Sequence, residues 1–336
     1  MPKSRARSKS KDSRHPINRK VSVSSNQSNE GWSSTIIKKA DKNGICICTN
    51  KELPCWHFQH RNIKYGYRYC RGINSAFTSL FYIHNETVNV WAHIIAVILL
   101  TIYTLSIIDI NEFINEFGLI NQLIIVIVFF IGSVFPLLCS AFCHNFYCVS
   151  KSIHRYCWFI DFLGILIAML LHGSALVYYG FINKSYIYIP YITFLSLFFV
   201  VCIVWCLKLY IPHTSAEIFV PCDRFPEFSF ILSTYVTFAS FLPLLLIFIY
   251  QDPLVKPDYY PLFLQLVSLP LIVSTGIVAF SQGGIPERFN KQLLLPENTF
   301  DIVGHSHQIW HLVSAAFMFF AINALIKHVK YTLTLQ

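Results

Sequence analysis

The stretch SHQIWHLVSAAFMFFAINALIK, residues 306–327, decides the fold class of this chain. About 20 mostly apolar residues are enough to cross the hydrocarbon core of a bilayer as one helix. Six further apolar runs of similar length lie near residues 88–108, 122–144, 156–180, 186–207, 228–250 and 260–280. A backbone in lipid must satisfy its own hydrogen bonds, which a helix does within one segment. The sequence therefore predicts an all-α membrane protein, built as a seven-transmembrane helix bundle.

The distribution of charge predicts the orientation of this bundle. Of the 26 Lys and Arg residues, 16 lie in residues 1–71, together with only 4 of the 17 Asp and Glu residues. Loops expected on the same side as the N-terminus carry further positive charge, at Lys151, Arg155, Lys208, Arg224, Arg288 and Lys291. Because positively charged loops are retained inside, we expect a cytoplasmic N-terminus and an extracellular or lumenal C-terminus. The plasma membrane and the endoplasmic reticulum both fit this pattern.

Composition divides the chain into four parts. Residues 1–43 are rich in Ser, Lys and Arg and poor in apolar residues, which predicts a disordered, basic cytoplasmic tail. Residues 44–87 are expected to form a cytoplasmic juxtamembrane segment, residues 88–328 the membrane domain, and residues 329–336 a short non-cytoplasmic tail. Nucleic acid is not an expected partner, because the basic tail is tethered to a membrane.

The juxtamembrane segment contains Cys46, Cys48 and Cys55, the last followed by His57. A C-x-C pair followed by C-x-H could form a second zinc site. The surrounding sequence ELPCWHFQHRNIKYGYR, however, is typical of an amphipathic segment that lies before the first span. A cytoplasmic location argues against disulfides. We therefore favour reduced thiols that are packed or palmitoylated.

Chemically active side chains gather where three spans reach the cytoplasmic side. His307 and His311 are four residues apart in the first turns of the seventh span, so they share one helix face. The second span delivers His144 to the same end of the bundle, with Ser140 one turn deeper. The third span starts there and carries Asp161, which inside a membrane is unfavourable without a partner. Topology thus predicts that three imidazoles, a hydroxyl and a carboxylate meet at one membrane depth.

Three neutral imidazoles would leave a tetrahedral Zn²⁺ with one open position, as in catalytic zinc sites. A bound water would become more acidic, and the ion could polarise a carbonyl. Asp161 would then orient or deprotonate the water, and Ser140 would donate to a developing oxyanion. Two alternatives stay open. Asp161 could pair structurally with a neighbouring helix, or Cys148 could close the site as a fourth ligand.

Other polar residues in the spans are interpreted as structural. His84, Glu86, Asn89 and His93 surround the start of the first span, in HNETVNVWAH. They are expected to cap that helix and to form inter-helix hydrogen bonds rather than to bind metal. His172, deep in the third span, is interpreted as hydrogen-bonded packing.

Several motifs in sequence order resemble the progestin and adipoQ receptor family, which includes the adiponectin receptors and fungal zinc-homeostasis membrane proteins. They are GYR (66–68), SLFYIHNETVNVWAHIIAVIL (79–99), Ser140 with His144, Asp161, GIPERF (284–289) and FDIVGHSHQIWHL (300–312). The resemblance implies seven helices with a cytoplasmic N-terminus and a zinc ion held by three histidines. The zinc ligands map onto His144, His307 and His311, and the aspartate that contacts the zinc through water maps onto Asp161.

The resemblance also bears on the function. Adiponectin-receptor members are linked to ceramidase activity, and fungal members to zinc, sterol and lipid regulation. One interpretation is a zinc-dependent amidohydrolase that takes a ceramide-like lipid from the bilayer. The other is a non-enzymatic receptor or regulator with structural zinc, acting through an extracellular protein ligand and a cytoplasmic partner at the N-terminal region. A transporter is disfavoured because the spans carry few charges and show no inverted repeat.

Overall fold

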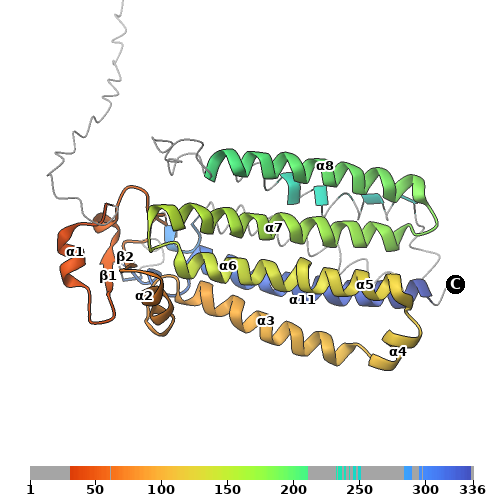
Figure 1. Ribbon diagram of the computed structural model, residues 1–336, viewed down its shortest axis with the longest axis horizontal. Helices are drawn as coiled ribbons and strands as arrows, with labels where there is room; N and C mark the ends of the chain where they lie inside the picture. Colours follow the sequence, from red (N-terminus) through yellow and green to blue (C-terminus); the bar gives the residue numbers. More distant parts are fainter. Residues whose placement is uncertain are drawn as a thin grey trace, which may run out of the picture.

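The computed structural model describes residues 31–60, 62–210, 284–289, 295–296 and 298–333, with individual residues between 232 and 250. Within these residues, five helical segments are long and apolar enough to cross a membrane. They are α3 (Thr87–Ile107), α5 to α6 (Gly118–Phe146), α7 (Lys151–Gly180), α8 (Ser185–Tyr210) and α11 (Ser306–Leu333). The segments run side by side along the long axis of the molecule (Figure 1).

These five helices coincide with five of the seven predicted spans. The predicted span at 228–250 is described only in part, and the one at 260–280 lies outside the described residues. Large apolar side chains face outward along the helices, including Ile102, Leu105 and Leu197, each at least 60% exposed. Because exposed apolar surface of this extent is unfavourable in water, these faces are suited to contact with lipid.

The second spanning segment contains a π-helical turn, η3 (Phe130–Val134), between α5 (Gly118–Phe129) and α6 (Phe135–Phe146). Pro136 lies at the start of α6 and has no N–H to donate to the preceding turn, which explains the local departure from α-helical geometry. His172 of α7 lies with its Nε2 3.0 Å from Ser133 Oγ in this turn. The interpretation of His172 as hydrogen-bonded packing is therefore confirmed.

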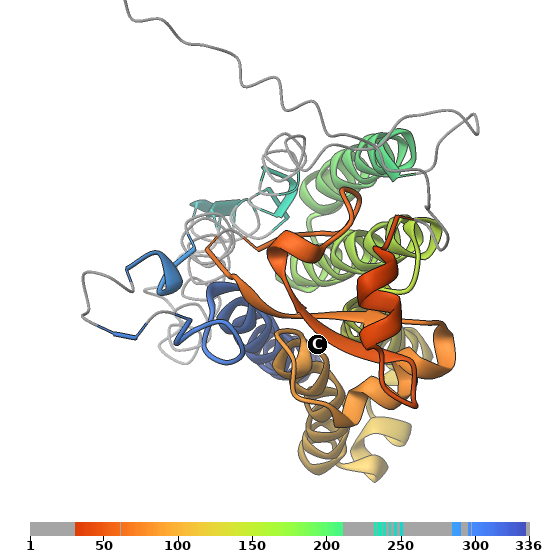
Figure 2. The same cartoon turned by 90° about the vertical axis from the view of Figure 1, so that its left-hand side faces the viewer.

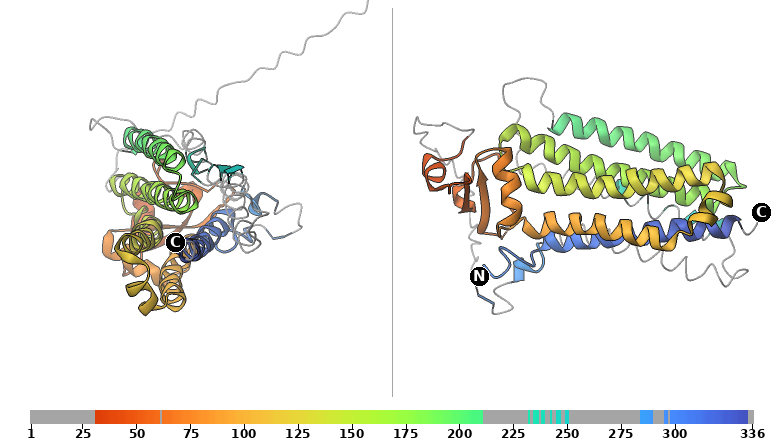
Figure 3. Two further views of the ribbon diagram at one scale, coloured as in Figure 1. Left: turned by 90° about the vertical axis from the view of Figure 1, so that its right-hand side faces the viewer. Right: turned by 60° about the horizontal axis from the view of Figure 1, so that its bottom comes forward.

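One end of the bundle is covered by residues 31–60 and 62–82, which we call the cap (Figure 2). The cap contains the short helices α1 (Ser34–Lys39), η1 (Asn50–Glu52), α2 (Ile73–Thr78) and η2 (Ser79–Phe81). Between them, β1 (Ile45–Thr49) and β2 (Tyr65–Cys70) pair antiparallel, with Ile45 opposite Cys70. The opposite end of the bundle holds α4 (Ile110–Asn115) and the C-terminal end of α11 (Figure 3).

The cap corrects two predictions. The disordered tail was expected to extend to residue 43, whereas α1 is helical and both Trp32 and Ile36 are buried. Residues 1–30 lie outside the described part of the chain. The fold was expected to be all-α, whereas β1 and β2 form a two-stranded sheet. The fold is mostly helical with this one small sheet among the described residues.

The cap is fastened to the bundle by buried polar contacts. The Arg68 guanidinium on β2 donates to the main-chain carbonyls of His144 and Asn145, at 2.8 Å to Asn145. These carbonyls end helix α6, where the chain provides no further backbone donors. The positive charge of Arg68 is also favourable beside the negative end of the helix dipole. The arginine of the GYR motif thus fixes the position of the helix turn that carries His144.

Candidate metal centre

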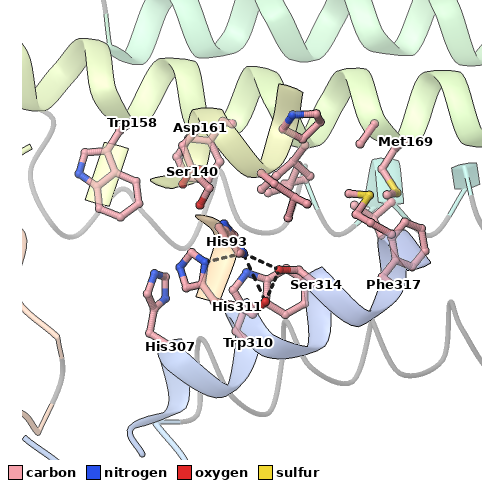
Figure 4. Close-up of a pocket in the computed structure, with 18 residues that line it drawn as sticks. His93, Ser140, Trp158, Asp161, Met169, His307, Trp310, His311, Ser314 and Phe317 are labelled. Carbon is pink, nitrogen blue, oxygen red and sulfur yellow. Dashed lines mark hydrogen bonds between the residues drawn. The ribbon is translucent and has the colours of Figure 1, made fainter. Parts of the chain in front are cut away.

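Three histidines from two helices meet at the cap end of the bundle. His144 near the end of α6 and His307 and His311 in the first turns of α11 each offer a ring nitrogen, all within 4.8 Å of one another. The Nε2 atoms of His307 and His144 are 3.3 Å apart. Nε2 of His311 is buried without a hydrogen-bond partner among the described residues. Figure 4 shows His307 and His311 directed toward the same space.

This arrangement fits a metal ion. A neutral imidazole presents one lone pair, and a buried lone pair without a partner is unfavourable. A cation bound by His144, His307 and His311 would satisfy the nitrogen of His311 that is left without a partner. Three imidazoles are a ligand set that suits zinc. The structure thus supports the capacity of the predicted histidines to hold a metal.

Glu86 orients His144 from outside the histidine cluster. Its Oε2 lies 2.7 Å from His144 Nδ1, so the other ring nitrogen of His144, Nε2, is the one turned toward the cluster. Glu86 also accepts from Asn89 at 2.6 Å and from the Tyr147 hydroxyl at 3.0 Å, and lies 2.8 Å from His60. A carboxylate that holds a ligand histidine in this way fixes its tautomer and ring orientation.

The charge of Glu86 is stabilised within the protein. Burial alone would raise its pKa, but the interactions of the carboxylate with His144 and His60 hold the pKa well below its usual value. Four donors surround the two carboxylate oxygens, which suits the ionised form. Glu86 was predicted to take part in helix capping and inter-helix hydrogen bonding; its side chain makes the inter-helix contact with His144 but no capping hydrogen bond. It acts instead on a residue of another helix.

His93 has the corresponding relation to His311. Its Nε2 lies 3.0 Å from His311 Nδ1, and both side chains are buried. This contact leaves Nε2 of His311 as the nitrogen that faces the other two histidines. The inter-helix hydrogen bonding predicted for His93 is confirmed, because this pair joins α3 to α11.

Asp161 and Ser140 lie beside the cluster, across from His307 and His311 (Figure 4). Oδ2 of Asp161 is 3.9 Å from Nε2 of His144. The Ser140 hydroxyl lies close enough to the Asp161 carboxylate to interact with it. Both side chains are buried, and Ser140 lies one helical turn from His144 on α6. The structure therefore brings together all five predicted site residues.

A cavity adjoins the histidines and extends between α6, α7 and α11. Its volume is about 100 Å³. Polar groups line one end, including His307, His311, Ser140 and Asp161. The remaining wall is apolar and includes Phe162, Ile165, Met169, Leu232, Phe317 and Met318. A cavity with this gradient suits a ligand with a polar group at one end and a hydrocarbon chain at the other.

The cysteine alternatives are not supported within the described residues. Cys148 is absent from the groups that could hold a metal, and its thiol contacts the carbonyl of Asn145. Cys143 is the thiol nearest the site, because it forms a second such group with His144 and Asp161. Cys46, Cys48 and Cys55 form no such group, and the first two are buried among aromatic residues of the cap. Packed, reduced thiols were the favoured interpretation for these two.

Glu86, His60 and Cys143 were not identified as site residues from the sequence. Glu86 lies 58 positions before His144, so no local spacing connects them. The only available signal was the presence of an acidic residue among histidines in HNETVNVWAH. Cys143 is next to His144 in the sequence. Its thiol lies near the site because α6 packs against α7 at this point, which the sequence alone does not show.

Comparisons with known proteins show the family of the chain. Residues 81–321 match the family described as Haemolysin-III related. The chain is 29% identical over 271 residues to Heptahelical transmembrane protein 1 of Arabidopsis thaliana, covering 78% of this chain and 74% of that protein. It is 28% identical over 297 residues to the Adiponectin receptor protein of Drosophila melanogaster, covering 81% and 57%. It is 27% identical over 163 residues to the ADIPOR-like receptor IZH2 of Saccharomyces cerevisiae, covering 47% and 50%.

Proposed function

The chain belongs to the Haemolysin-III related family of multi-pass integral membrane proteins, and we propose that it is an adiponectin-receptor-like seven-helix protein that binds zinc and hydrolyses a ceramide-like lipid. The observation that carries this proposal is the juxtaposition of three histidines, Asp161 and Ser140 at the polar end of an apolar cavity. The plasma membrane or the endoplasmic reticulum is consistent with the relatives.

Contacts of the described residues between 232 and 250 support a count of seven spans. Helix α8 ends at the cap end of the bundle and α11 begins there, so the chain between them crosses an even number of times. The Tyr235 hydroxyl donates a hydrogen bond to the carbonyl of Leu166, in the middle of α7. The carbonyl of Tyr250 accepts a hydrogen bond from Lys184, which lies just past the end of α7 that is farther from the cap. This stretch therefore runs away from the cap. One returning span would complete the proposed count of seven, and the sequence predicts an apolar run for it at 260–280, outside the described residues.

The proposed orientation has the cap in the cytoplasm. The basic excess lies in residues 1–71, which include most of the cap, and positively charged segments are retained inside. With seven spans, the end of α11 then lies outside the cell or in the lumen. The metal centre lies at the cap end, close to the cytoplasmic face.

The proposed ligands of zinc are His144, His307 and His311. Zinc bound there supplies a Lewis acid that polarises a carbonyl and makes a coordinated water more acidic. The apolar wall of the cavity holds the acyl chain and places the amide near Ser140 and Asp161. The helices that surround the acyl chain exclude bulk water from the cavity. Polar contacts made there are therefore stronger than in water.

The reaction is amide hydrolysis. Oδ2 of Asp161 accepts a proton from the attacking water while a new C–O bond forms at the carbonyl carbon. The Ser140 hydroxyl donates a hydrogen bond to the oxygen that becomes negative. The C–N bond then breaks, and Asp161 returns its proton to the leaving nitrogen. The products are a fatty acid and the free amine of the sphingoid base, so one water is consumed for each amide cleaved.

Fatty-acid release from a ceramide by the purified, zinc-loaded protein tests this proposal. We expect Asp161→Ala to lower the rate by about 100-fold or more, because a general base contributes roughly 10²–10⁴-fold. Zinc content is measured on the same samples, so that a lost metal is distinguished from a lost base. Equal rates in the two proteins, with zinc retained in both, would contradict hydrolysis.

A second candidate function has its own support. His144 and His311 belong to different helices, and they are held in place by Glu86, just before the first span, and His93 within it. Zinc in this position would brace three spans, as expected of a receptor or regulator with structural metal. An extracellular protein ligand and a cytoplasmic partner at the N-terminal region would then carry the signal. This function predicts that removal of zinc lowers the melting temperature while ceramide stays intact in every variant.

A further inference from the structure

The outward face of α2 and η2 is unusual for a segment outside the spans. Ile73 and Phe77 are each 53% exposed, Phe81 is 80% exposed, and Ile83 just beyond is 76% exposed. Large apolar side chains gathered in this way are unfavourable in water and mark a contact surface. The face lies beside the first turns of α3, at the cap end of the bundle (Figure 1).

The inward face of the same segment carries small and polar residues, whereas an inward face usually carries large apolar ones. Ser75, Ala76 and Ser79 are the buried residues. The Ser79 hydroxyl donates to the carbonyl of Ala76 at 2.6 Å and accepts from the Arg68 guanidinium. The segment is thus held by polar contacts to the protein, while its apolar residues are presented to the surroundings.

An open groove of about 580 Å³ lies where this segment meets the spans. Phe77 and Leu80 form one wall, and Val90, Leu138, Phe142 and Phe146 belong to α3 and α6. The Phe77 and Phe146 rings are 4.7 Å apart, and Trp91 donates its indole N–H to the carbonyl of Leu80 at 2.9 Å. Among the described residues that line the groove, Asn145 is the one amide.

The groove is continuous with the surface that faces lipid. Leu138 and Phe142 line it and are 48% and 46% exposed on a membrane-spanning helix. Trp91 lies at the start of α3, where aromatic side chains favour the boundary between water and hydrocarbon. Because the bilayer already covers the neighbouring faces of α3 and α6, hydrocarbon chains are the occupant that reaches this groove without crossing water.

We propose that α2 and η2 anchor the cap in the adjacent leaflet, inserted at the boundary of head groups and acyl chains. We further propose that the groove beside them holds one acyl chain of a phospholipid from that leaflet. An interfacial element of this kind buries its apolar face roughly 5–10 Å into the boundary region. The proposal does not depend on the metal or on hydrolysis.

Depth measurement by site-directed spin labelling tests the anchor. The background carries Cys55→Ser and Cys222→Ser. A spin label is attached at position 81 through Phe81→Cys. Lys51→Cys provides a water-exposed control, and Ile102→Cys provides a lipid-exposed control. In phosphatidylcholine nanodiscs, we expect the label at 81 to be relaxed by oxygen, as at 102, and protected from a water-soluble nickel chelate. A label at 81 that the chelate reaches as freely as at 51 places the segment in water, open to a protein partner, and overturns the proposal.

Photocrosslinking tests the groove. A phosphatidylcholine with a diazirine in its acyl chain is incorporated in the same nanodiscs, and the labelled peptides are identified. We expect labelling within residues 135–146, and its loss in Leu138→Trp, which fills the groove from a half-exposed position. Leu105→Trp, on a lipid-facing part of α3 outside the groove, serves as the matched control and retains the labelling. Labelling that survives in Leu138→Trp overturns the acyl-chain site.

Discussion

At the scale of single residues, the site depends on side chains that do not belong to the predicted ligand set. Glu86 and His93 select which nitrogen of His144 and His311 faces the metal position. Arg68 holds the backbone of the turn that carries His144. A histidine ligand needs a fixed tautomer and ring plane, and these residues supply both. The sequence pattern predicted the candidate ligands, whereas the residues that position them became visible only in three dimensions.

Glu86→Gln tests this positioning role. The side-chain amide would turn an N–H toward one of the donors around Glu86, so the hydrogen bond that fixes His144 would be weakened or lost. We expect metal affinity to fall by roughly 10–100-fold, as for other outer-shell carboxylates. Competition with a chelating dye measures the affinity. Glu112→Gln is the matched control, because Glu112 bonds Lys330 at the opposite end of the bundle. Unchanged affinity in Glu86→Gln would contradict the role.

We expect the protonation of His57 to make the stability of the cap depend on pH. Burial lowers its pKa from 6.5 to about 4, and its Nε2 has no partner among the described residues. The unfolded cap therefore binds a proton between these pH values while the folded cap does not, so stability falls as the pH drops from 6.5 toward 4. The loss approaches about 3 kcal/mol at the low end of this window.

Hydrogen exchange of the cap at pH 7.5 and pH 5 measures this dependence, after correction for intrinsic exchange rates. His57→Phe keeps an aromatic ring against Trp32 and Tyr147 but cannot be protonated. We expect the variant to lose most of the pH dependence. An identical dependence in both proteins would show that other groups cause it.

At the scale of elements, the long helices were predictable and the cap was not. Spans such as 88–108 and 186–207 are evident from their length and hydropathy, because each must match the thickness of the bilayer. Strands β1 and β2 show no alternation, since five of the six residues of β2 are buried. They lie between the bundle and α1, so neither face is consistently exposed, and the period-2 signal of a half-buried strand is lost. Helix α1 was missed because six residues with two lysines resemble a solvated tail.

Gly66 shows how closely the cap and bundle fit. Its φ of +90° favours glycine, and a Cβ there would lie 2.5 Å from Cδ1 of Ile302 and 3.3 Å from the backbone nitrogen of Asn85. We expect Gly66→Ala to destabilise the protein by about 1–3 kcal/mol from backbone strain, with the clash in addition. Gly72→Ala is the control, because a Cβ on Gly72 would meet no described atom within 4 Å. Melting temperatures in detergent compare the two, and equal values would argue against this fit.

At the scale of the whole molecule, the cap, the first span and the metal centre form one connected unit. The cap contacts α6 through Arg68, and the first span contacts His144 and His311 through Glu86 and His93. Residues from the beginning, middle and end of the described chain thus meet at the cap end of the bundle. Such an arrangement suits a site that acts on the polar end of a membrane lipid, because that end lies near the boundary of the hydrocarbon region.

The metal content of the purified protein tests the central claim most directly. Elemental analysis by mass spectrometry, after extensive dialysis, gives the number of metal ions per chain in the wild type and in the double variant His307→Ala, His311→Ala. The variant keeps the apolar part of α11, and its secondary structure is checked by circular dichroism. We predict about one zinc per wild-type chain and none in the variant, since one imidazole cannot hold the ion. Zinc retained by a folded double variant, or a wild type without zinc that is folded and functional, would contradict the account.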